Sequence, residues 1–295
     1  MSMDRLALII LNYNSYEDTV RCVDRLLSFK EDYRIVVVDN NSPDGSGERL
    51  QARYNGTPDT DVILSDRNGG YGAGNNIGIR FADERFSADT VAIINPDVDI
   101  PASVVLRTLY DKLKSNERYG IIGACLTFRD GSFNLNYSAW NIPTPAQIAG
   151  KQSLFTRRYK IRFKEDILEP GVLKTECIAG CFFMARMDVM KQIGLFDENM
   201  FMFNEEDAIG IRCRDAGYLA VLMPDQHYYH DHHTPSKEGM TFSSKVHDTA
   251  DSYVTAKYLC RKYYNGKGLV RLWIVEVINR IYLALAYFKY KITGV

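Results

Sequence analysis

Short apolar runs recur along the first hundred residues, and each is followed by a polar loop and a helical pattern. The runs cover residues 6–11, 35–38, 62–64 and 91–94. Between the first two, Val20, Val23 and Leu27 return at helical spacing. Unbroken apolar runs are typical of strands buried on both faces of a parallel sheet. The alternation therefore predicts an α/β fold with right-handed crossovers and a mostly parallel central sheet.

A polar cluster follows each of the four predicted strands. The clusters are marked by Asn12, Asp39, Asn68 and Asp97. The carboxyl ends of parallel strands meet at one edge of the sheet, and open α/β sheets bind their ligands outside that edge. We therefore expect the four clusters to converge on one binding site.

The glycine-rich segment 70–74 resembles a dinucleotide fingerprint only loosely. It follows the third predicted strand rather than the first, and its spacing departs from G-x-G-x-x-G. We interpret it as backbone that lets a ligand approach closely, and not as an NAD site.

Three consecutive acids, Glu205, Glu206 and Asp207, open a helical run for which Gly217 is the predicted C-cap. A short strand is expected over 219–223, ended by Pro224. Histidines follow at His227, His230, His232 and His233. Acids and imidazoles at the two ends of one compact unit suit a site that needs a proton acceptor and a metal ligand. A solvated acidic helix start, favoured by the helix dipole, is the alternative.

Two further regions lack the strand–helix alternation. Residues 128–171 are irregular, which is typical of a lid or binding loop. Residues 236–240 are expected to form a mobile loop, and 247–264 and 269–292 to form helices. The longest uncharged run of the last helix, 281–288, is far shorter than the roughly 20 residues that span a bilayer. Its aromatics and cations suit peripheral contact with a membrane surface, while a homodimer contact and a core helix are the alternatives.

Composition narrows the class of protein. A net charge of −1 over 295 residues gives no reason to expect a nucleic-acid partner. The six cysteines form no CxxC pair, so neither a zinc site nor a disulfide framework is indicated. The N-terminus enters an apolar strand without the segments of a signal peptide. We expect a cytoplasmic protein with reduced cysteines.

An ordered series of motifs carries a family resemblance. The series is NYN at 12–14, VDNNS at 38–42, NGGYGAGNN at 68–76, NPD at 95–97, AGCFFMAR at 179–186, GLFDE at 194–198 and AGY at 216–218. With the acids before the last helix and a histidine beyond it, this order resembles the inverting glycosyltransferases of family 2. The rhamnosyltransferase-like bacterial members that build surface polysaccharides are the most similar. The resemblance covers about residues 6–262.

The resemblance implies a GT-A fold, with a Rossmann-like sheet, helices on both its faces and further C-terminal helices. Residues 1–245 would form the glycosyltransferase domain, with a nucleotide-sugar-binding half at 1–127 and an acceptor and catalytic half at 128–245. Residues 246–295 would be a helical extension. The implied reaction moves a sugar from a UDP- or dTDP-sugar, with dTDP-rhamnose as one candidate, to a lipid-linked saccharide at the inner face of the membrane.

The resemblance also assigns residues. The donor contacts are Asn12, Asp39, Asn41, Asn68, Gly69, Gly70, Asn75 and Asp97. The acceptor contacts are Gly180 and Cys181, and the ligands of a Mg²⁺ or Mn²⁺ ion are Asp97, Asp99 and His230. The first acid of the family's DxD motif is Asn95 here. A carboxylate at Asp39 can accept the ring N–H of uracil or thymine, which cytosine lacks, although guanine offers one too.

The catalytic base falls on Glu206 when the family's acidic motif is counted back from 216–218. The family's next acid falls on Ala208, and Asp207 lies between them, so Glu206 and Asp207 both stay candidates. In the implied mechanism the base takes a proton from the acceptor hydroxyl, which attacks the anomeric carbon from the opposite face. His230 either completes the metal site or contacts the diphosphate.

Two rival functions remain. A sugar-phosphate nucleotidyltransferase would need a glycine- and basic-rich loop after the first strand, which NYNSYEDT at 12–19 lacks. A non-catalytic partner subunit of the same fold would fit the departures at Asn95 and Ala208.

Overall fold

The computed structural model describes residues 2–154, 163, 166–230 and 242–293. The chain forms two compact units. The first comprises Met1–Ile142, Arg162–Phe201 and Glu205–Thr234, and the second Pro143–Ile161, Met202–Asn204 and Pro235–Val295. The boundaries expected from the sequence, after 127 and 245, stay predictions.

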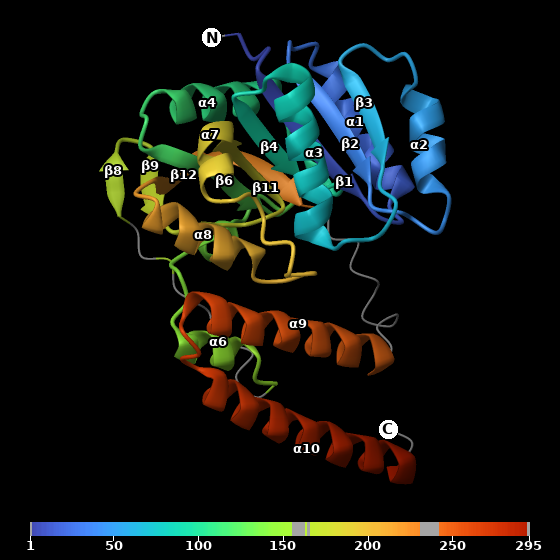
Figure 1. The fold of residues 1–295 in the computed structure, drawn as a ribbon, viewed down its shortest axis with the longest axis vertical. Coiled ribbons are helices and arrows are strands. Elements are labelled where there is room, and N and C mark those ends of the chain that lie inside the picture. The colour runs from blue at the N-terminus through green and yellow to red at the C-terminus, as the bar shows by residue number, and fades with distance from the viewer. Residues whose placement is uncertain (1, 155–162, 164–165, 231–241, 294–295) are drawn as a thin grey trace. The chain divides into compact units, whose positions relative to one another are not determined.

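The first unit contains a ten-stranded sheet with the order β3-β2-β1-β4-β11-β6-β12-β9-β8, with β5 paired to β12 (Figure 1). Its first four strands along the chain are parallel neighbours: β1 (Leu6–Asn12), β2 (Arg34–Asp39), β3 (Thr60–Leu64) and β4 (Thr90–Ile94). Apart from the half-exposed β3, they are buried almost throughout, as their apolar runs predict. The prediction of an α/β fold with a mostly parallel central sheet is confirmed.

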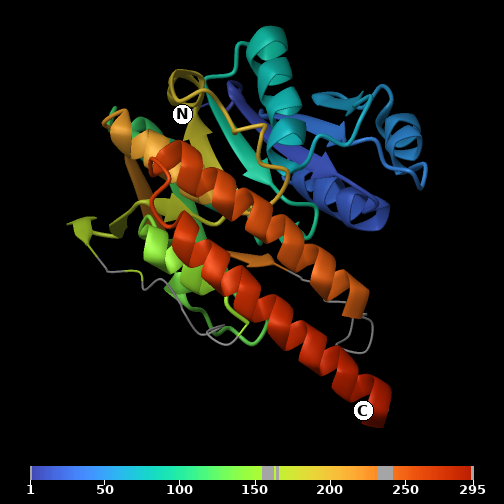
Figure 2. The ribbon, with the colours of Figure 1, turned by 60° about the horizontal axis from the view of Figure 1, so that its bottom comes forward.

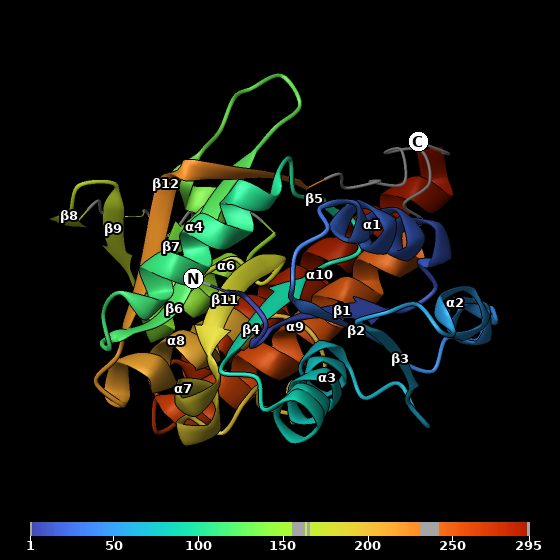
Figure 3. The same ribbon diagram turned by 90° about the horizontal axis from the view of Figure 1, so that it is seen from above.

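Helices cover both faces of this sheet, as Figure 3 shows from above. One apolar core includes side chains of α1 (Tyr16–Ser28), α2 (Ser46–Tyr54) and α4 (Ser103–Lys114). The other includes side chains of α3 (Tyr71–Phe86), α7 (Met187–Gln192) and α8 (Glu205–Asp215). In α1 the buried positions Thr19, Cys22, Val23 and Leu26 form one stripe, which is what helical spacing requires.

The other half of the sheet is built from β6 (Tyr119–Thr127), β11 (Phe182–Arg186) and β12 (Leu219–His230), followed by β9 (Val172–Thr175) and β8 (Ile167–Glu169). β11 runs antiparallel between β4 and β6, while β12 is parallel to β6. The direction of β11 was not evident from its apolar residues alone.

The expectation that Pro224 ends a strand at Met223 is wrong. β12 continues for twelve residues through Pro224 to His230. Its pairing with β6 shifts register between Met223 and His227, so the proline lies in a bulge. Proline has no N–H to donate to a ladder and is tolerated at such irregularities. The continuation brings His230 opposite Val98 in the short strand β5 (Val98–Asp99).

The segment expected to be irregular, 128–171, contains several short elements. These are α5 (Leu135–Ser138), β7 (Ala139–Trp140), α6 (Pro145–Lys151) and β8. β7 pairs with β10 (Cys177–Ile178) in a separate two-stranded sheet. The expected mobile loop at 236–240 lies outside the described residues.

The second unit is helical. α9 (Phe242–Tyr263) and α10 (Leu269–Thr293) run side by side, as Figure 2 shows. Asn279 joins them to the chain after α6, because its amide donates to Gln152 O at 2.7 Å and to Tyr253 Oη at 3.0 Å. Within the described part of the chain, no helix is both long and apolar enough to cross a membrane.

Candidate active site

The carboxylate of Asp39 is held at the end of β2 by a buried hydrogen-bond network. Its Oδ1 accepts from Asn12 Nδ2 at 2.6 Å and from Ser42 Oγ at 2.6 Å, and its Oδ2 accepts from Ser42 N at 2.9 Å. Asn12 is fully buried, and its own Oδ1 accepts from Thr19. A Cβ on Gly47 would lie 2.6 Å from Asp39 Oδ2, so glycine keeps the space beside that oxygen open.

The residues after β3 are tied to those after β2. Asn40 Nδ2 donates to Asn68 Oδ1 at 2.9 Å and to Gly70 O at 3.2 Å, and Gly69 N donates back to Asn40 Oδ1 at 3.3 Å. A Cβ on Gly70 would lie 2.3 Å from Phe201 O. Position 70 therefore requires a glycine, because another backbone approaches it closely. In this structure that backbone is the one at Phe201 and not a ligand. Asn41 is exposed, with φ of 59°.

Asn75, in the first turns of α3, is almost completely buried. Its Nδ2 donates to Tyr71 O at 3.0 Å, whereas its Oδ1 finds no hydrogen-bond donor among the described residues. A buried acceptor without a donor is costly, but this oxygen is enclosed, so it could meet a ligand hydroxyl only after a local movement.

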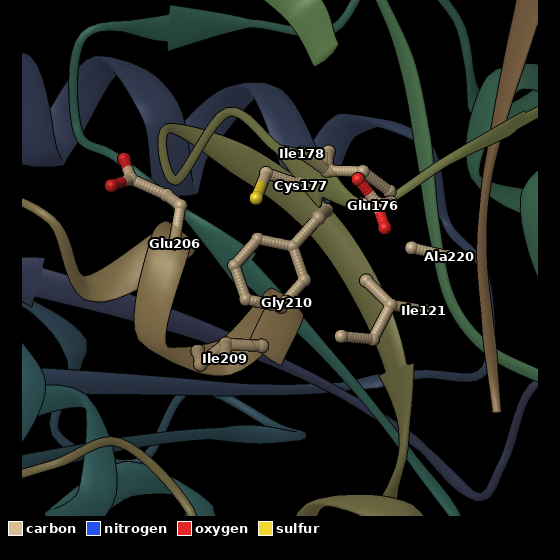
Figure 4. Close-up of a pocket in the computed structure, with 9 residues that line it drawn as sticks. Ile121, Glu176, Cys177, Ile178, Glu206, Ile209, Gly210 and Ala220 are labelled. Carbon is tan, nitrogen blue, oxygen red and sulfur yellow. The ribbon is translucent and has the colours of Figure 1, made fainter. Parts of the chain in front are cut away.

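The three consecutive acids at the start of α8 differ in environment. Glu205 and Asp207 are buried, while Glu206 is half-buried and lines a small cavity opposite Glu176 (Figure 4). Burial raises the pKa of Glu205 to about 8, and the charges of Glu206 and Asp207 add to the shift. Asp207 Oδ1 accepts the indole N–H of Trp140 at 2.7 Å. Of the three, Glu206 is therefore the carboxylate best placed to meet a substrate.

Glu206 is oriented by the peptide that precedes β11. Its Oε1 accepts from Gly180 N at 3.2 Å, and a Cβ on Gly180 would lie 2.8 Å from that oxygen. Tyr71 Oη donates to Gly180 O at 2.7 Å and lies 3.2 Å from Asn95 Oδ1. Burial raises the pKa of Tyr71 well above its usual value, and the charge of Glu206 adds to the shift, so the hydroxyl keeps its proton.

His230 and Asp97 meet at the end of β12, with 3.0 Å between His230 Nε2 and Asp97 Oδ1. Burial disfavours protonation of His230, but hydrogen bonds to Asp97 and Cys181 outweigh burial and raise its pKa to about 10. Cys181 also lies 3.1 Å from Tyr228 Oη, and its backbone O accepts from Asn95 N at 2.8 Å. The peptide 180–181 thus connects the environment of Glu206 with that of the Asp97–His230 pair.

Asp99 points to a different set of partners. Its carboxylate lies 3.1 Å from Arg129 and 3.9 Å from Arg25. Within the described residues there is no group of three or more His, Cys, Asp and Glu side chains that could hold a metal ion alone. Asp97 and His230 could hold a divalent ion shared with substrate phosphates only after His230 loses the proton that binds Asp97, because neutral imidazole is the form that ligates a metal.

The comparison with known families decides the class. The family model described as "Glycosyl transferase family 2" matches residues 7–194. The chain belongs to glycosyl transferase family 2. The family expected from the ordered motifs is thereby confirmed.

Curated relatives of this family 2 glycosyltransferase include three from different organisms. It is 32% identical over 215 residues to the low-salt glycan biosynthesis hexosyltransferase Agl10 of Haloferax volcanii, covering 72% of this chain and 62% of Agl10. It is 26% identical over 241 residues to the N-acetylglucosaminyl-diphospho-decaprenol L-rhamnosyltransferase of Mycobacterium tuberculosis, covering 77% and 76%. It is 26% identical over 259 residues to the rhamnosyltransferase WbbL of Escherichia coli, covering 86% and 92%.

Solved structures support the fold of the transferase. The mannosyltransferase PcManGT from Pyrobaculum calidifontis, solved with GDP-Man and Mn²⁺, superimposes with a TM-score of 0.58 at 17% identity, covering 85% of this chain and 64% of that one. GalNAc-T7, solved with UDP, GalNAc and Mn²⁺, gives a TM-score of 0.55 at 16% identity, covering 76% and 43%. The predicted GT-A fold is confirmed.

The individual residue roles in the transferase stay predictions, but their placement is clear. The structure joins Asn12 with Asp39, and Asp97 with His230, while Asp99 pairs with arginines. His232 and His233 lie outside the described residues.

Sequence reasoning missed Tyr71 and Trp140, which position the acids of α8 through contacts across long stretches of chain. Tyr71 lies inside the glycine-rich motif, which was its only signal.

Proposed function

We propose that the transferase moves a sugar from a UDP- or dTDP-sugar to a hydroxyl of a lipid-linked saccharide, with inversion, in surface polysaccharide synthesis. dTDP-rhamnose is the first donor to test, because two of the relatives are named as rhamnosyltransferases. The name of the mycobacterial relative specifies an acceptor on a diphospho-decaprenol, which supports a lipid-linked acceptor here.

One observation carries this proposal. The peptide 180–181 holds the half-buried Glu206 on one side and contacts the Asp97–His230 pair on the other. In a single displacement the acceptor hydroxyl and the leaving group lie on opposite sides of the anomeric carbon. The reaction therefore needs a proton acceptor and a diphosphate site that face each other, here across residues 180–181. An intact acid at this place disfavours the non-catalytic alternative.

The donor side provides recognition. Within the described residues Asp39 Oδ2 accepts a hydrogen bond from Ser42 N, and Gly47 leaves space beside it, so it suits the ring N–H of uracil or thymine. Asn12 holds the Asp39 carboxylate in place by donating a hydrogen bond to it.

In the mechanism that follows, Glu206 accepts the proton of the acceptor hydroxyl. The N–H of Gly180 keeps its carboxylate aimed, and Tyr71 keeps the peptide of Gly180 in place. The hydroxyl oxygen forms the new bond to the anomeric carbon as the bond to the diphosphate breaks, and the configuration inverts. A Mg²⁺ or Mn²⁺ ion held by Asp97 and His230 would neutralise charge on the departing diphosphate.

Contact with a membrane surface is part of the proposal, because a lipid-linked acceptor is reached there. α10 exposes the large apolar side chains of Val270, Trp273 and Ile281 beside cations such as Arg271, a combination that suits the headgroup layer. The helix would lie on the surface, at the inner face of the membrane. A homodimer through the same side chains is the alternative.

The test is a panel of nucleoside diphosphates measured by calorimetry with and without Mn²⁺. We expect UDP or dTDP to bind and Mn²⁺ to tighten the binding, and we expect Asp97→Ala to remove the effect of the metal. Equal affinity with and without the metal would contradict the assigned metal role. NMR of the product tests inversion. The new glycosidic bond should have the anomeric configuration opposite to that of the sugar in the donor.

A further inference from the structure

A second cavity, of about 330 Å³, lies beside Asp97 in the first unit. Arg21 and Arg25 of α1 form one wall. Asp97 and Asp99, next to β5, form another, and Arg129, from the segment that follows β6, completes the lining. The cavity therefore shares Asp97 with the proposed diphosphate site but is bounded by residues to which the proposed reaction gives no role.

The arginines of this cavity are accessible, although each has partners. Arg21 pairs with Asp18, Arg25 donates to the carbonyl oxygens of Ile100 and Pro101, and Arg129 lies over the ring of Tyr229 at 4.7 Å. Their side chains are 54%, 44% and 56% exposed for Arg21, Arg25 and Arg129. Arg25 and Arg129 share the single carboxylate of Asp99. Ion pairs that are exposed to this degree are weak, so an incoming anion can compete for the guanidinium groups.

The charge of the lining favours an anionic ligand with several oxygens. Three guanidinium groups face two carboxylates, and one of these, Asp97, is occupied by His230. Guanidinium groups bind phosphate through two parallel hydrogen bonds, which a carboxylate-poor, arginine-rich cavity can offer more than once. A phosphate or diphosphate matches this arrangement, whereas a neutral sugar does not need it.

Exposed aromatic side chains lie in the same segment as Arg129. Phe128, Phe133 and Tyr137 are 44%, 52% and 47% exposed, and the rings of Phe128 and Tyr137 lie edge to face at 5.8 Å. Thr127 pairs with Phe133, which holds the segment as a turn. Exposed aromatic faces bind sugar rings and apolar chains.

We propose that this cavity is the acceptor's phosphate subsite. Arg25 and Arg129 bind the diphosphate that links the saccharide to its lipid, Arg21 adds positive charge, and the exposed aromatic side chains contact the groups on either side of the diphosphate. The assignment rests on the proposed function, since it concerns the second substrate of the same reaction. No bond is formed or broken in the cavity.

The experiment measures binding without transfer. Calorimetry in EDTA, which prevents a metal from holding the probe at Asp97, compares farnesyl diphosphate with farnesol. We expect the wild-type protein to bind the diphosphate and not the alcohol. The double variant Arg25→Ala, Arg129→Ala should bind it at least about tenfold more weakly, because it lacks two guanidinium groups that hydrogen-bond to the anion. Arg53→Ala on α2, whose guanidinium pairs with Asp24, is the matched control and should behave as wild type.

Nucleotide binding with Mn²⁺ distinguishes the acceptor's diphosphate from the donor's. If the double variant keeps its affinity for UDP or dTDP, it is folded and the cavity does not serve the donor, as we expect. A parallel loss of nucleotide affinity, with the thermal transition unchanged, would overturn the acceptor assignment. Unchanged binding of farnesyl diphosphate in the double variant would overturn the subsite itself. If no nucleotide binds to the wild-type protein, the proposed function fails, while the farnesyl diphosphate result still decides whether the cavity binds a diphosphate.

Discussion

The donor side and the acceptor side of the candidate site are positioned by contacts that differ in their separation along the chain. Asp39, on the donor side, is fixed by Asn12, Ser42 and the neighbouring Ser46–Asn12 contact, all within 34 positions of one another. Glu206, on the acceptor side, is fixed by Gly180, and Gly180 is fixed by Tyr71, which lies 109 positions away in the chain. The part of the donor side around Asp39 is therefore built by adjacent parallel strands, whereas the orientation of Glu206 depends on a contact between segments 109 positions apart.

The largest expected effect separates chemistry from binding. Glu206→Gln should keep nucleotide affinity and lower turnover by roughly 10²- to 10⁴-fold, the usual loss for a general base. Gln keeps the size of the side chain and removes its ability to take a proton. Steady-state kinetics and nucleotide titration measure the two quantities.

Asp207→Asn is the control for this variant. Its carboxylate is buried and faces the indole of Trp140, so we expect a much smaller loss of turnover. If Asp207→Asn abolishes transfer while Glu206→Gln is near wild type, the base is Asp207 and the assignment is wrong by one residue.

Two glycines provide a matched pair, one on each side of the site. Gly180→Ala places a Cβ 2.8 Å from Glu206 Oε1, and Gly47→Ala places one 2.6 Å from Asp39 Oδ2. We expect Gly180→Ala to lower turnover by about 10- to 100-fold with nucleotide affinity retained, because misplacing a reacting group by about 1 Å has effects of this size. Gly47→Ala should weaken nucleotide binding instead.

If the two alanine variants have the same effect on turnover and nucleotide affinity, the contrast between the two sides of the site is wrong. Thermal unfolding checks that each variant is folded. The check matters most for Gly47→Ala, because several hydrogen bonds hold the Asp39 carboxylate in place, whereas the Glu206 side chain can move away from a new Cβ. A loss of nucleotide affinity in Gly180→Ala would show that the two sides are not independent.

The same difference in range explains what the sequence could predict. Asn12, Asp39 and Asn68 follow strands whose apolar runs are unambiguous, so their meeting at one edge follows from parallel pairing alone. The direction of β11 and the extension of β12 through Pro224 depend on pairing between distant segments, which a local pattern does not specify.

Side-chain partners were harder to predict than positions. Asp97 and Asp99 are two residues apart and have the same chemistry, yet one meets His230 and the other meets Arg25 and Arg129. In an extended chain, residues two positions apart point to the same side, but Asp97 precedes β5 and lies in the turn that leads into it, whereas Asp99 belongs to β5, so periodicity gave no basis to distinguish them.

Trp140→Phe tests the support behind the base. Phe fills most of the space of the indole but removes the N–H that Asp207 Oδ1 accepts at 2.7 Å. Loss of a hydrogen bond to a buried charged group should lower the free energy of unfolding by about 1.5 to 3 kcal/mol. Urea unfolding measures this, and Trp273→Phe, at an exposed position of α10, is the control for replacing a tryptophan. An unchanged midpoint in Trp140→Phe would mean that the contact does not stabilise the start of α8.

The most gradual expected effect concerns Glu205, because it is spread over several pH units. Burial and the charges of Glu206 and Asp207 raise its pKa to about 8. The charge of Glu205 is in turn one of the causes that raise the pKa of the buried Tyr71 hydroxyl. Between the ordinary carboxyl pKa of 4.5 and about 8, the folded protein keeps a proton that the unfolded chain has lost. The free energy of unfolding should therefore fall as pH rises through this window, by up to about 1.4 kcal/mol per pH unit from this group.

The variant Glu205→Gln cannot ionise at position 205, so the difference in stability between variant and wild type should grow from pH 5 to pH 8 in favour of the variant. Urea titrations at several pH values measure that difference and cancel the contributions of the other carboxyl groups. A constant difference across the window would mean that Glu205 is already ionised in the folded protein.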